Sequence, residues 1–253
     1  MKALLFAAGL GTRLKPFTDL HPKALAIVNG KPLLQRNIEY LQSFGINEFV
    51  INIHHFGNQI IDFLALNNNF NSIIHISDEI DEVLETGGGL MKAKNFLEDS
   101  DFLVMNTDIL TQLNLTKMID FHYKNKPLVT LAVSHRESTR KILFDKKNQL
   151  CGWINLQTGE EIRPISGLNV HDPKNQVLGE FPPSGVRGLA FSGIHIINPN
   201  IFNLITETGK FSIMKSYMRL METENILGFD HTGVVLIDVG KPEAIIKAEE
   251  IFK

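Results

Sequence analysis

A glycine-rich run near the N-terminus combines flexible backbone with positive side chains. It reads Gly9-Leu10-Gly11-Thr12-Arg13-Leu14-Lys15-Pro16 and directly follows the apolar stretch Lys2–Ala8. Glycine lets backbone N–H groups approach an anion without a Cβ in the way, and a glycine turn after the first strand of an α/β sheet is a common phosphate site. We therefore expect these amides to bind phosphate together with the cations Arg13, Lys15 and Lys23.

Two familiar phosphate loops do not fit this run. A Walker A loop needs Gly-Lys-Ser/Thr, but Gly11 is followed by Thr12-Arg13. A dinucleotide fingerprint needs a third glycine where Leu14 stands, and an acidic residue after the second strand, where Asn52 lies. Because Pro16 also disfavours a helical conformation at Lys15, the loop should not enter a helix at once. A solvated surface turn is the remaining alternative.

Two aspartates follow apolar stretches that resemble buried strands. Asp108 ends Val104-Met105-Asn106-Thr107-Asp108, and Asp238 ends Leu236-Ile237-Asp238. Carboxylates at the carboxyl ends of strands lie where open α/β sheets bind ligands, and two of them can share one Mg²⁺. Each alone could equally be a loop or cap residue. Lys23, between Pro22 and Ala24, could be a surface lysine or a phosphate ligand.

A third feature is Leu84-Glu85-Thr86-Gly87-Gly88-Gly89. Three glycines lower the stability of a helix, so a packing or ligand reason is expected, and open backbone can bind a base edge. A plain turn is the alternative. The nine histidines show no metal-binding spacing, no Gly-x-Ser-x-Gly elbow occurs, and the single cysteine, Cys151, cannot form an internal disulfide.

Alternating strands and helices must position these residues. In the first half we expect strands at Lys2–Ala8, Glu48–Ile53, Ile73–Ser77 and Asp101–Asn106, and helices at Pro32–Phe44, Asn58–Leu66, Leu90–Leu97 and Leu115–Tyr123. Such alternation predicts an α/β fold with a parallel sheet covered on both faces.

The second half is less regular. We expect strands at Leu128–Ser134, Ile142–Asp145, Leu150–Leu156, Leu189–Ile197, Ile226–Phe229 and Val234–Asp238, and helices at Pro199–Thr206, Phe211–Glu222 and Glu243–Phe252. The stretch Gln157–Arg187 is polar and rich in Gly and Pro. No linker is evident, so one domain is expected over residues 1–253, with a nucleotide-binding half (1–125) and a sugar-binding half (126–253).

Composition excludes several classes of protein. Of 253 residues, 43% are hydrophobic and 21% charged, as in a globular protein, and the net charge of −3 does not favour nucleic acid or an anionic membrane. No window approaches the length of a membrane span. We expect a cytoplasmic protein with small-molecule partners, no nucleic acid and no membrane.

Together these residues resemble the sugar-1-phosphate nucleotidyltransferase family, the pyrophosphorylases that make nucleotide sugars. The resemblance covers nearly the whole chain apart from roughly residues 135–187. It rests on Leu5–Thr18, Pro22-Lys23-Ala24-Leu25, Gly30-Lys31-Pro32-Leu33, Leu84–Gly88, Asn106-Thr107-Asp108, Phe191-Ser192-Gly193-Ile194 and Asp238-Val239-Gly240. Within the family, the chain is most similar to the N-acetylmuramate 1-phosphate uridylyltransferases in its short length and in the segment Leu84–Gly89. The mannose-1-phosphate guanylyltransferases are nearly as similar.

The resemblance implies a three-layer α/β/α, Rossmann-like fold with a mostly parallel mixed sheet. It implies a site that binds an NTP, a sugar 1-phosphate and Mg²⁺ or Mn²⁺, in a monomer or small homo-oligomer. The nucleotide would be held by Ala7, Ala8, Gly9, Gly11, Thr12, Arg13, Lys23, Asn52, Glu85, Thr86 and Gly88. The sugar would lie near Thr107, Ser192 and Gly193, the metal would be bound by Asp108 and Asp238, and Arg13, Lys23 and Asp108 would act in catalysis.

The expected reaction is NTP + sugar 1-phosphate → NDP-sugar + pyrophosphate, with UTP and N-acetylmuramate 1-phosphate, or another hexose 1-phosphate, as first choices. Arg163 or Arg187 could then bind the lactyl carboxylate of muramate. The alternatives are GTP with mannose 1-phosphate, a regulatory protein that binds a nucleotide sugar without turnover, and a dehydrogenase. Leu14 and the missing acidic residue argue against the last.

Overall fold

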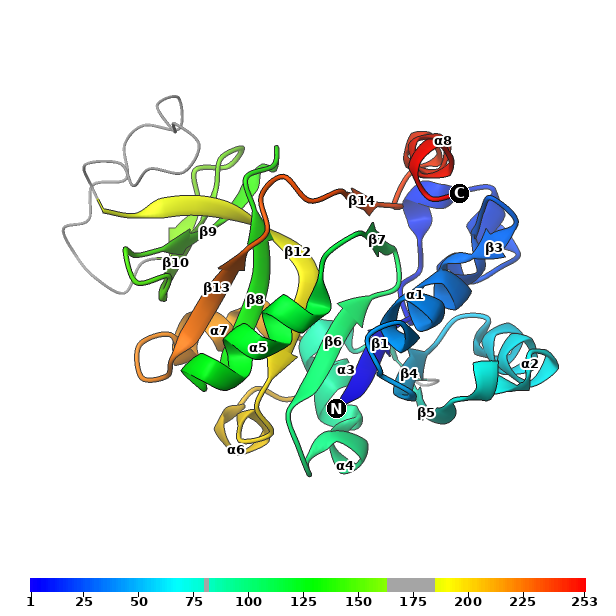
Figure 1. Ribbon diagram of the computed structural model, residues 1–253, viewed down its shortest axis with the longest axis horizontal. Coiled ribbons are helices and arrows are strands. Elements are labelled where there is room, and N and C mark those ends of the chain that lie inside the picture. Colours follow the sequence, from blue (N-terminus) through cyan, green and yellow to red (C-terminus); the bar gives the residue numbers. More distant parts are fainter. Residues whose placement is uncertain (80–81, 163–184) are drawn as a thin grey trace.

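The N-terminal half of the molecule is a parallel sheet. The computed structural model describes residues 1–79, 82–162 and 185–253. Its first four long strands are β1 (Lys2–Phe6), β4 (Glu48–Ile53), β5 (Ile73–Asp78) and β6 (Phe102–Asn106), and they lie in the order β6-β1-β4-β5 (Figure 1). The chain moves outward from β1 to β5 and then returns to the other side of β1. This reversal makes the carboxyl ends of β1 and β6 the place where a ligand can enter.

The C-terminal half extends the same sheet with mostly antiparallel pairs. Its strands are β8 (Val129–Ser134), β9 (Arg140–Phe144), β10 (Leu150–Asn155), β11 (Glu161–Ile162), β12 (Arg187–Ile197) and β13 (Ile226–Asp230). The long strand β12 pairs antiparallel with β6, β8 and β9 and so joins the two halves, while β13 pairs parallel with β8. The predicted α/β class with a mixed central sheet is confirmed.

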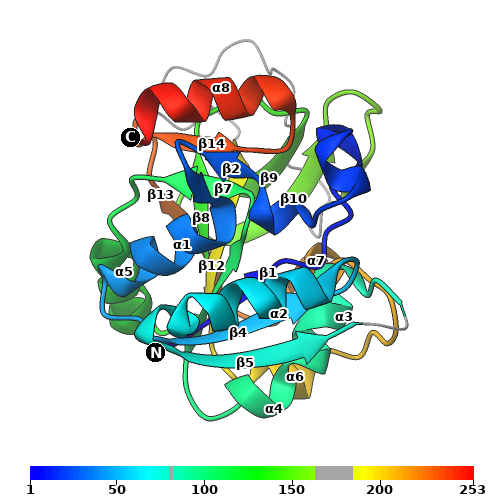
Figure 2. The same ribbon diagram turned by 90° about the vertical axis from the view of Figure 1, so that its right-hand side faces the viewer.

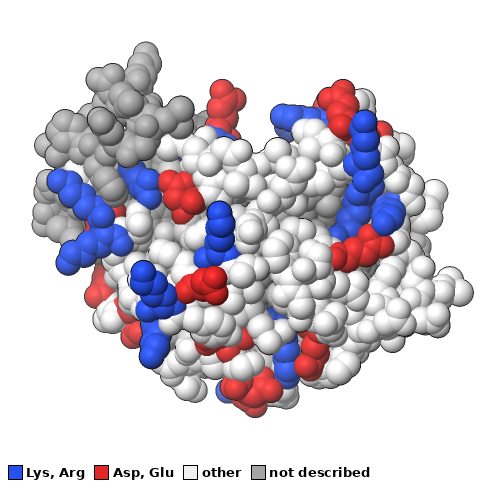
Figure 3. Space-filling model, in the orientation of Figure 1, with Lys and Arg blue, Asp and Glu red and all other residues white. Residues whose placement is uncertain are grey.

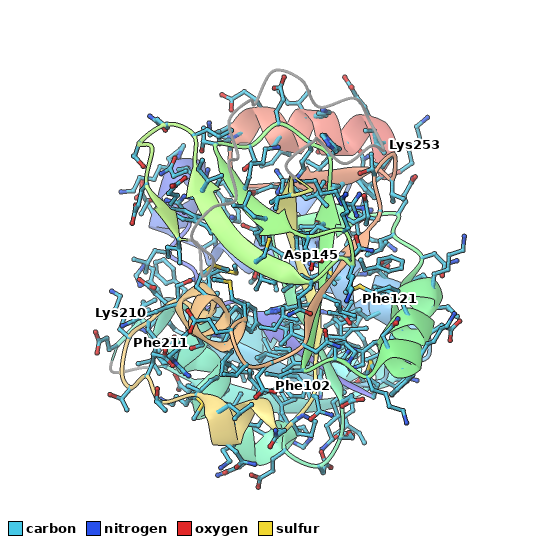
Figure 4. All side chains as sticks on the ribbon, turned by 90° about the vertical axis from the view of Figure 1, so that its left-hand side faces the viewer. Phe102, Phe121, Asp145, Lys210, Phe211 and Lys253 are labelled. Carbon is cyan, nitrogen blue, oxygen red and sulfur yellow. The ribbon has the colours of Figure 1, made fainter. Side chains whose placement is uncertain are left out.

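Helices cover both faces of the sheet. One face is covered by α1 (Leu33–Gln42), α2 (Gly57–Leu66) and α5 (Leu115–Asn125), whose apolar residues share one core cluster with β1 and β4. The other is covered by α3 (Glu85–Lys92), α4 (Lys94–Leu97), α6 (Ile201–Leu204) and α7 (Ile213–Leu220) (Figure 2). Phe102 belongs to this second cluster and lies in the interior (Figure 4).

Smaller elements complete the fold. The strands β2 (Ile27–Val28) and β3 (Lys31–Pro32) form a hairpin, and β7 (Ile109–Thr111) pairs antiparallel with β14 (Leu236–Asp238). The C-terminal helix α8 (Pro242–Ile251) packs on these short pairs. On the face in Figure 3, positive and negative side chains are interspersed. Among the described residues, no helix is long and apolar enough to cross a bilayer.

Most expected elements agree with the structure within a few residues, and Glu48–Ile53 agrees at both ends. The helix expected at Leu90–Leu97 is wrong at its start. Helix α3 already begins at Glu85, so the three glycines lie inside it and do not precede it. Tertiary packing explains why glycine is tolerated there: a Cβ on Gly87 would overlap Phe211, and one on Gly88 would overlap the carbonyl oxygen of Gly209. The pairing of β7 with β14 was not expected.

Candidate active site

A cleft of about 290 Å³ opens at the carboxyl ends of β1 and β6. The segment that follows β1 forms one wall and the N-terminal end of α3 the other; in Figure 2 the dark blue segment lies above α3. Twelve of the residues expected in the site line it: Ala7, Ala8, Gly9, Gly11, Thr12, Arg13, Lys23, Asn52, Glu85, Thr86, Thr107 and Asp108. The fold therefore brings the motifs of the N-terminal half together around one space.

Gly11 shapes the first wall. Its φ of +61° lies in the left-handed region, and a Cβ there would stand 2.8 Å from Thr18 Cγ2 and 2.9 Å from Lys23 Cβ. Its carbonyl oxygen accepts hydrogen bonds from Leu14 N at 2.8 Å and Thr18 Oγ1 at 2.9 Å. Only glycine meets both demands, the backbone conformation and the close packing. As expected, no long helix follows, because Thr12–Leu14 is a single 3₁₀ turn and Lys15 is extended.

A buried polar network holds the back of the cleft. The side-chain oxygen of Asn52 accepts hydrogen bonds from Ala7 N at 2.7 Å and Ala8 N at 3.3 Å, and its Nδ2 donates to Glu79 Oε1 at 2.7 Å. The other oxygen of Glu79 accepts from Leu84 N at 2.9 Å. Glu79 is only 1% exposed, so these bonds compensate for the burial of its carboxyl group. The network ties the end of β1 to the start of α3.

The second wall is anchored by the segment before α7. Gly87 N donates to Phe211 O at 2.8 Å, Phe211 N donates to Leu84 O at 3.1 Å, and Ile213 N donates to Thr86 Oγ1 at 3.0 Å. Figure 4 shows Lys210 at the edge of the molecule and the buried Phe211 beside it. Glu85, at the entrance to the cleft, has a φ of +59°, which is strained for a residue with a side chain.

Asp108 and Asp238 are brought together by the β7–β14 pair. Asp238 lies opposite Ile109 in the register, and Val239 N donates to Asp108 O at 2.7 Å. Lys23 Nζ forms a hydrogen-bonded ion pair with Asp108 Oδ2. The Arg13 guanidinium lies near Asp238, because both side chains lie against Gly240. A Cβ built on Gly240 would be 2.6 Å from Arg13 Nη2 and 2.7 Å from Asp238 Oδ1.

The charges around Asp108 and Asp238 would suit a bound metal cation. Burial raises the pKa of Asp238, the Asp108 carboxylate raises it further, and the charges of Lys23, Arg13 and Arg136 oppose the rise. Two carboxylates that repel each other offer the hard oxygen ligands that Mg²⁺ prefers. Among the described residues no third His, Cys, Asp or Glu joins them, so a metal here would take its remaining ligands from water or from substrate phosphates.

The three residues expected near the sugar have different neighbours, and of them only Thr107 lines the cleft. Thr107 lines it, and its Oγ1 donates to Phe6 O at 2.7 Å. Ser192 is fully buried and shares a 2.7 Å hydrogen bond with His231 Nε2. Gly193 has a φ of +72° where the register of β12 shifts, and a Cβ there would lie 3.0 Å from Asn106 Nδ2.

Some expected residues do not face the cleft. Gly88 is buried against Gly209 and does not line it, which makes its role one of packing. Lys15 is paired with Asp19 at 2.8 Å on the surface. Arg187 is engaged by Asp230 at 2.9 Å and by Asn148 at 2.7 Å. Arg163 lies outside the described residues.

Sequence reasoning assigned no role to several residues of the site. Glu79, Asn106 and Gly240 line the cleft, and Arg136 acts on the charge of Asp238. Gly240 follows Asp238 by two positions, and Asn106 ends an apolar strand, so a search around the aspartates would have found both. Nothing local distinguishes Glu79 or Arg136, whose partners come from distant parts of the chain.

A family model described as nucleotidyl transferase matches residues 2–142. An N-acetylmuramate alpha-1-phosphate uridylyltransferase of Neisseria meningitidis is 31% identical over 242 residues, covering 95% of this chain and 93% of that protein. A mannose-1-phosphate guanyltransferase of Yarrowia lipolytica is 26% identical and covers 100% of this chain, which spans 64% of that protein. HddC from Yersinia pseudotuberculosis, solved with GMP-PN, superposes with a TM-score of 0.76 at 25% identity, covering 100% of this chain and 99% of that one.

Proposed function

This chain belongs to the nucleotidyl transferase family, and we propose that it transfers a nucleotidyl group from an NTP to a sugar 1-phosphate, which gives an NDP-sugar and pyrophosphate. The observation that carries the proposal is the convergence of Arg13, Lys23 and Asp108, which line the cleft, with Asp238, which the β7–β14 pair holds beside Asp108. Cations beside a metal-binding carboxylate pair suit a reaction between two phosphate anions.

The chemistry asks little of a general base. The second pKa of a phosphate monoester is about 6, so a sugar 1-phosphate is largely ionised at pH 7 and can attack the α-phosphorus in line. Arg13 and Lys23 offset the repulsion between the two substrates, and Arg13 stabilises the charge that grows on the departing pyrophosphate. The strained Glu85 and the neighbouring Thr86 border the space for the base.

Asp108 and Asp238 would hold Mg²⁺, or Mn²⁺, in this proposal. When bound, such an ion neutralises phosphate charge. Lys23 forms an ion pair with Asp108, so Lys23 and the ion would both act on this carboxylate. The donors are all oxygen, which favours these two ions over zinc or copper.

We place UTP and N-acetylmuramate 1-phosphate first among the substrates. The relative from Neisseria meningitidis, which this chain matches over nearly its whole length, supports this choice. GTP with mannose 1-phosphate is the second candidate. Glu85 favours it, because a carboxylate accepts two hydrogen bonds and guanine presents two adjacent donors. The likeness to a mannose-1-phosphate guanyltransferase points the same way.

The decisive experiment measures pyrophosphate release with UTP, GTP, dTTP and CTP against the 1-phosphates of N-acetylmuramate, N-acetylglucosamine, glucose and mannose. We expect UTP with N-acetylmuramate 1-phosphate to give the highest kcat/KM. Preference for GTP with mannose 1-phosphate would replace the substrates and keep the reaction. No release with any pair, while nucleotides still bind, would favour a regulatory protein that binds without turnover.

A further inference from the structure

Arg136 follows β8 and lies beside the part of β12 that contains Ser192 and Gly193. Its Nη2 donates to Phe191 O at 2.7 Å, which fixes the direction of the side chain against β12. Its own carbonyl oxygen accepts a 2.7 Å hydrogen bond from Lys141 Nζ. The guanidinium group is therefore held in place from both ends of the residue.

The hydrogen-bonding capacity of this arginine is largely unused. Its Nε is buried and has no hydrogen-bond partner, and Arg136 forms no ion pair with any residue that the structure describes. Arg136 is half-buried as a whole, but a buried N–H without an acceptor is costly, because it has lost its water without gaining a partner. Such a group is expected where a ligand supplies the missing acceptor.

Two basic side chains, Lys141 and His231, lie within reach of the charge of Arg136. Its charge lowers the pKa of both Lys141 and His231, in each case after burial as the larger cause. His231 contributes a second buried nitrogen, Nδ1, without a partner, while its Nε2 is bonded to Ser192. Burial lowers the pKa of Arg136 itself, and the negative charge of Asp238 opposes this, so the guanidinium is near enough to Asp238 for the two charges to interact.

We propose that the guanidinium group of Arg136 binds the phosphate group of the sugar 1-phosphate. The inference rests on the proposed function, and it makes Arg136 the residue that donates hydrogen bonds to this phosphate. The planar fork of an arginine matches two phosphate oxygens, and Nε is one of the two donors that such a fork uses. Arg13 and Lys23 are left for the phosphates of the nucleotide.

The position of Arg136 favours the phosphate over a carboxylate on the sugar. The attacking phosphate must reach the α-phosphorus, which lies next to the acid pair in the proposed reaction, and Arg136 is near enough to Asp238 for their charges to interact. A lactyl carboxylate lies on the sugar ring, farther from the reacting atoms. A phosphate-binding role therefore predicts the same dependence on Arg136 for every acceptor.

The test compares Arg136→Ala, Arg136→Lys and the matched control Arg140→Ala, an exposed arginine of β9. For Arg136→Ala we expect the KM of the sugar 1-phosphate, and the inhibition constant of inorganic phosphate as its competitor, to rise about 10- to 100-fold. The KM of the NTP and the Tm should stay close to wild type. Arg136→Lys should recover part of the affinity, and Arg140→Ala should change nothing.

Three results would overturn the proposal. These are an equal rise in both KM values, a lower Tm with unchanged affinity for the sugar 1-phosphate, and a loss confined to acceptors that carry a carboxylate. If wild-type protein releases no pyrophosphate with any acceptor, the proposed function fails, and calorimetry with inorganic phosphate then tests Arg136 alone. Binding that Arg136→Ala abolishes would support the site, and equal binding to both proteins would refute it.

Discussion

Asp108 and Asp238 lie side by side at the β7–β14 pair but have different neighbours. Asp108 is paired with Lys23, and both side chains are mostly shielded from water, with 21% and 12% exposure. Asp238 has no such single partner among the described residues, and partial burial and the Asp108 carboxylate raise its pKa. The same substitution should therefore affect the two residues differently.

We expect Asp108→Asn and Asp238→Asn each to lower kcat about 100-fold or more, because either would lose a metal ligand and negative charge. In metal-free protein, Asp108→Asn should cost about 1–3 kcal/mol, since Lys23 loses its partner, and the Tm should fall by roughly 2–12 °C. Asp238→Asn should leave the Tm unchanged or raise it, since its ionised carboxylate opposes folding at pH 7. Kinetics with Mg²⁺ measure kcat, and calorimetry in EDTA measures the Tm. Full turnover in EDTA would contradict the metal site.

Arg13 should matter more for the reaction than for nucleotide binding. Its guanidinium lies beside Gly240 and Asp238, where charge is expected to grow as pyrophosphate departs. We expect Arg13→Ala to lower kcat about 100-fold or more while the Kd of the NTP changes little. Lys15→Ala is the matched control, because Lys15 is exposed and paired with Asp19. If only the KM of the NTP rises, Arg13 serves in binding alone.

At the scale of elements, α3 is the part of the site whose sequence conflicts most with its structure. Glycine disfavours a helix, yet Gly87, Gly88 and Gly89 all lie within α3 and are buried. The missing side chains of Gly87 and Gly88 let the segment around Gly209 and Phe211 pack directly on the helix, and that of Gly89 leaves room for Glu79. Close packing, and not flexibility, is the reason for these glycines.

Gly88→Ala should consequently destabilise the protein, because the new Cβ would overlap the backbone oxygen of Gly209 and contact Leu84 Cβ at 2.8 Å. Overpacking of this kind costs about 1–3 kcal/mol, which corresponds to a Tm lower by roughly 2–12 °C. Gly9→Ala is the control, since a Cβ there meets nothing within 4 Å. Thermal unfolding of both variants measures the effect, and equal Tm values would show that α3 can move away from Gly209.

At the scale of the whole molecule, buried histidines make the fold sensitive to acid. Burial lowers the pKa of His195 to about 3, while the same side chain titrates near 6.5 in an unfolded chain. His195 is 2% exposed and bonded through Nδ1 to Tyr217 Oη at 2.7 Å. Burial also lowers the pKa of His122 and of His231. All three are more readily protonated when the chain unfolds.

Stability should therefore be fully present above pH 6.5 and decline as the pH falls, because the unfolded chain then binds protons that the folded protein does not. His195 alone should account for a loss of about 2 kcal/mol at pH 5. Unfolding at pH 5 in buffers of different ionisation enthalpy should show proton uptake. His195→Gln should flatten the profile, and His55→Gln, at an exposed residue, should not. A constant Tm from pH 8 to pH 5 would contradict this account.

The sequence alone determined the features that depend on neighbouring residues. The alternation of apolar runs predicted the α/β class, since side-chain periodicity reports the local element. The run from Gly9 to Arg13 predicted an anion-binding turn because glycine conformation and nearby charge are local properties, and the turn at Gly11 lines the cleft. Asp108 could be placed at a sheet edge because the strand before it is apolar and short.

Only the tertiary structure decided which distant groups meet. Asp238 joins Asp108 through the pairing of two three-residue strands, β7 and β14. The sequence predicted a strand that contains β14 but neither β7 nor the pairing, because no local pattern shows which distant strand is the partner. Glu79 and Arg136 look like ordinary charged residues in the sequence, and burial by remote segments gives them their roles. Burial and the partners of a charge arise from long-range packing, so no local pattern encodes them.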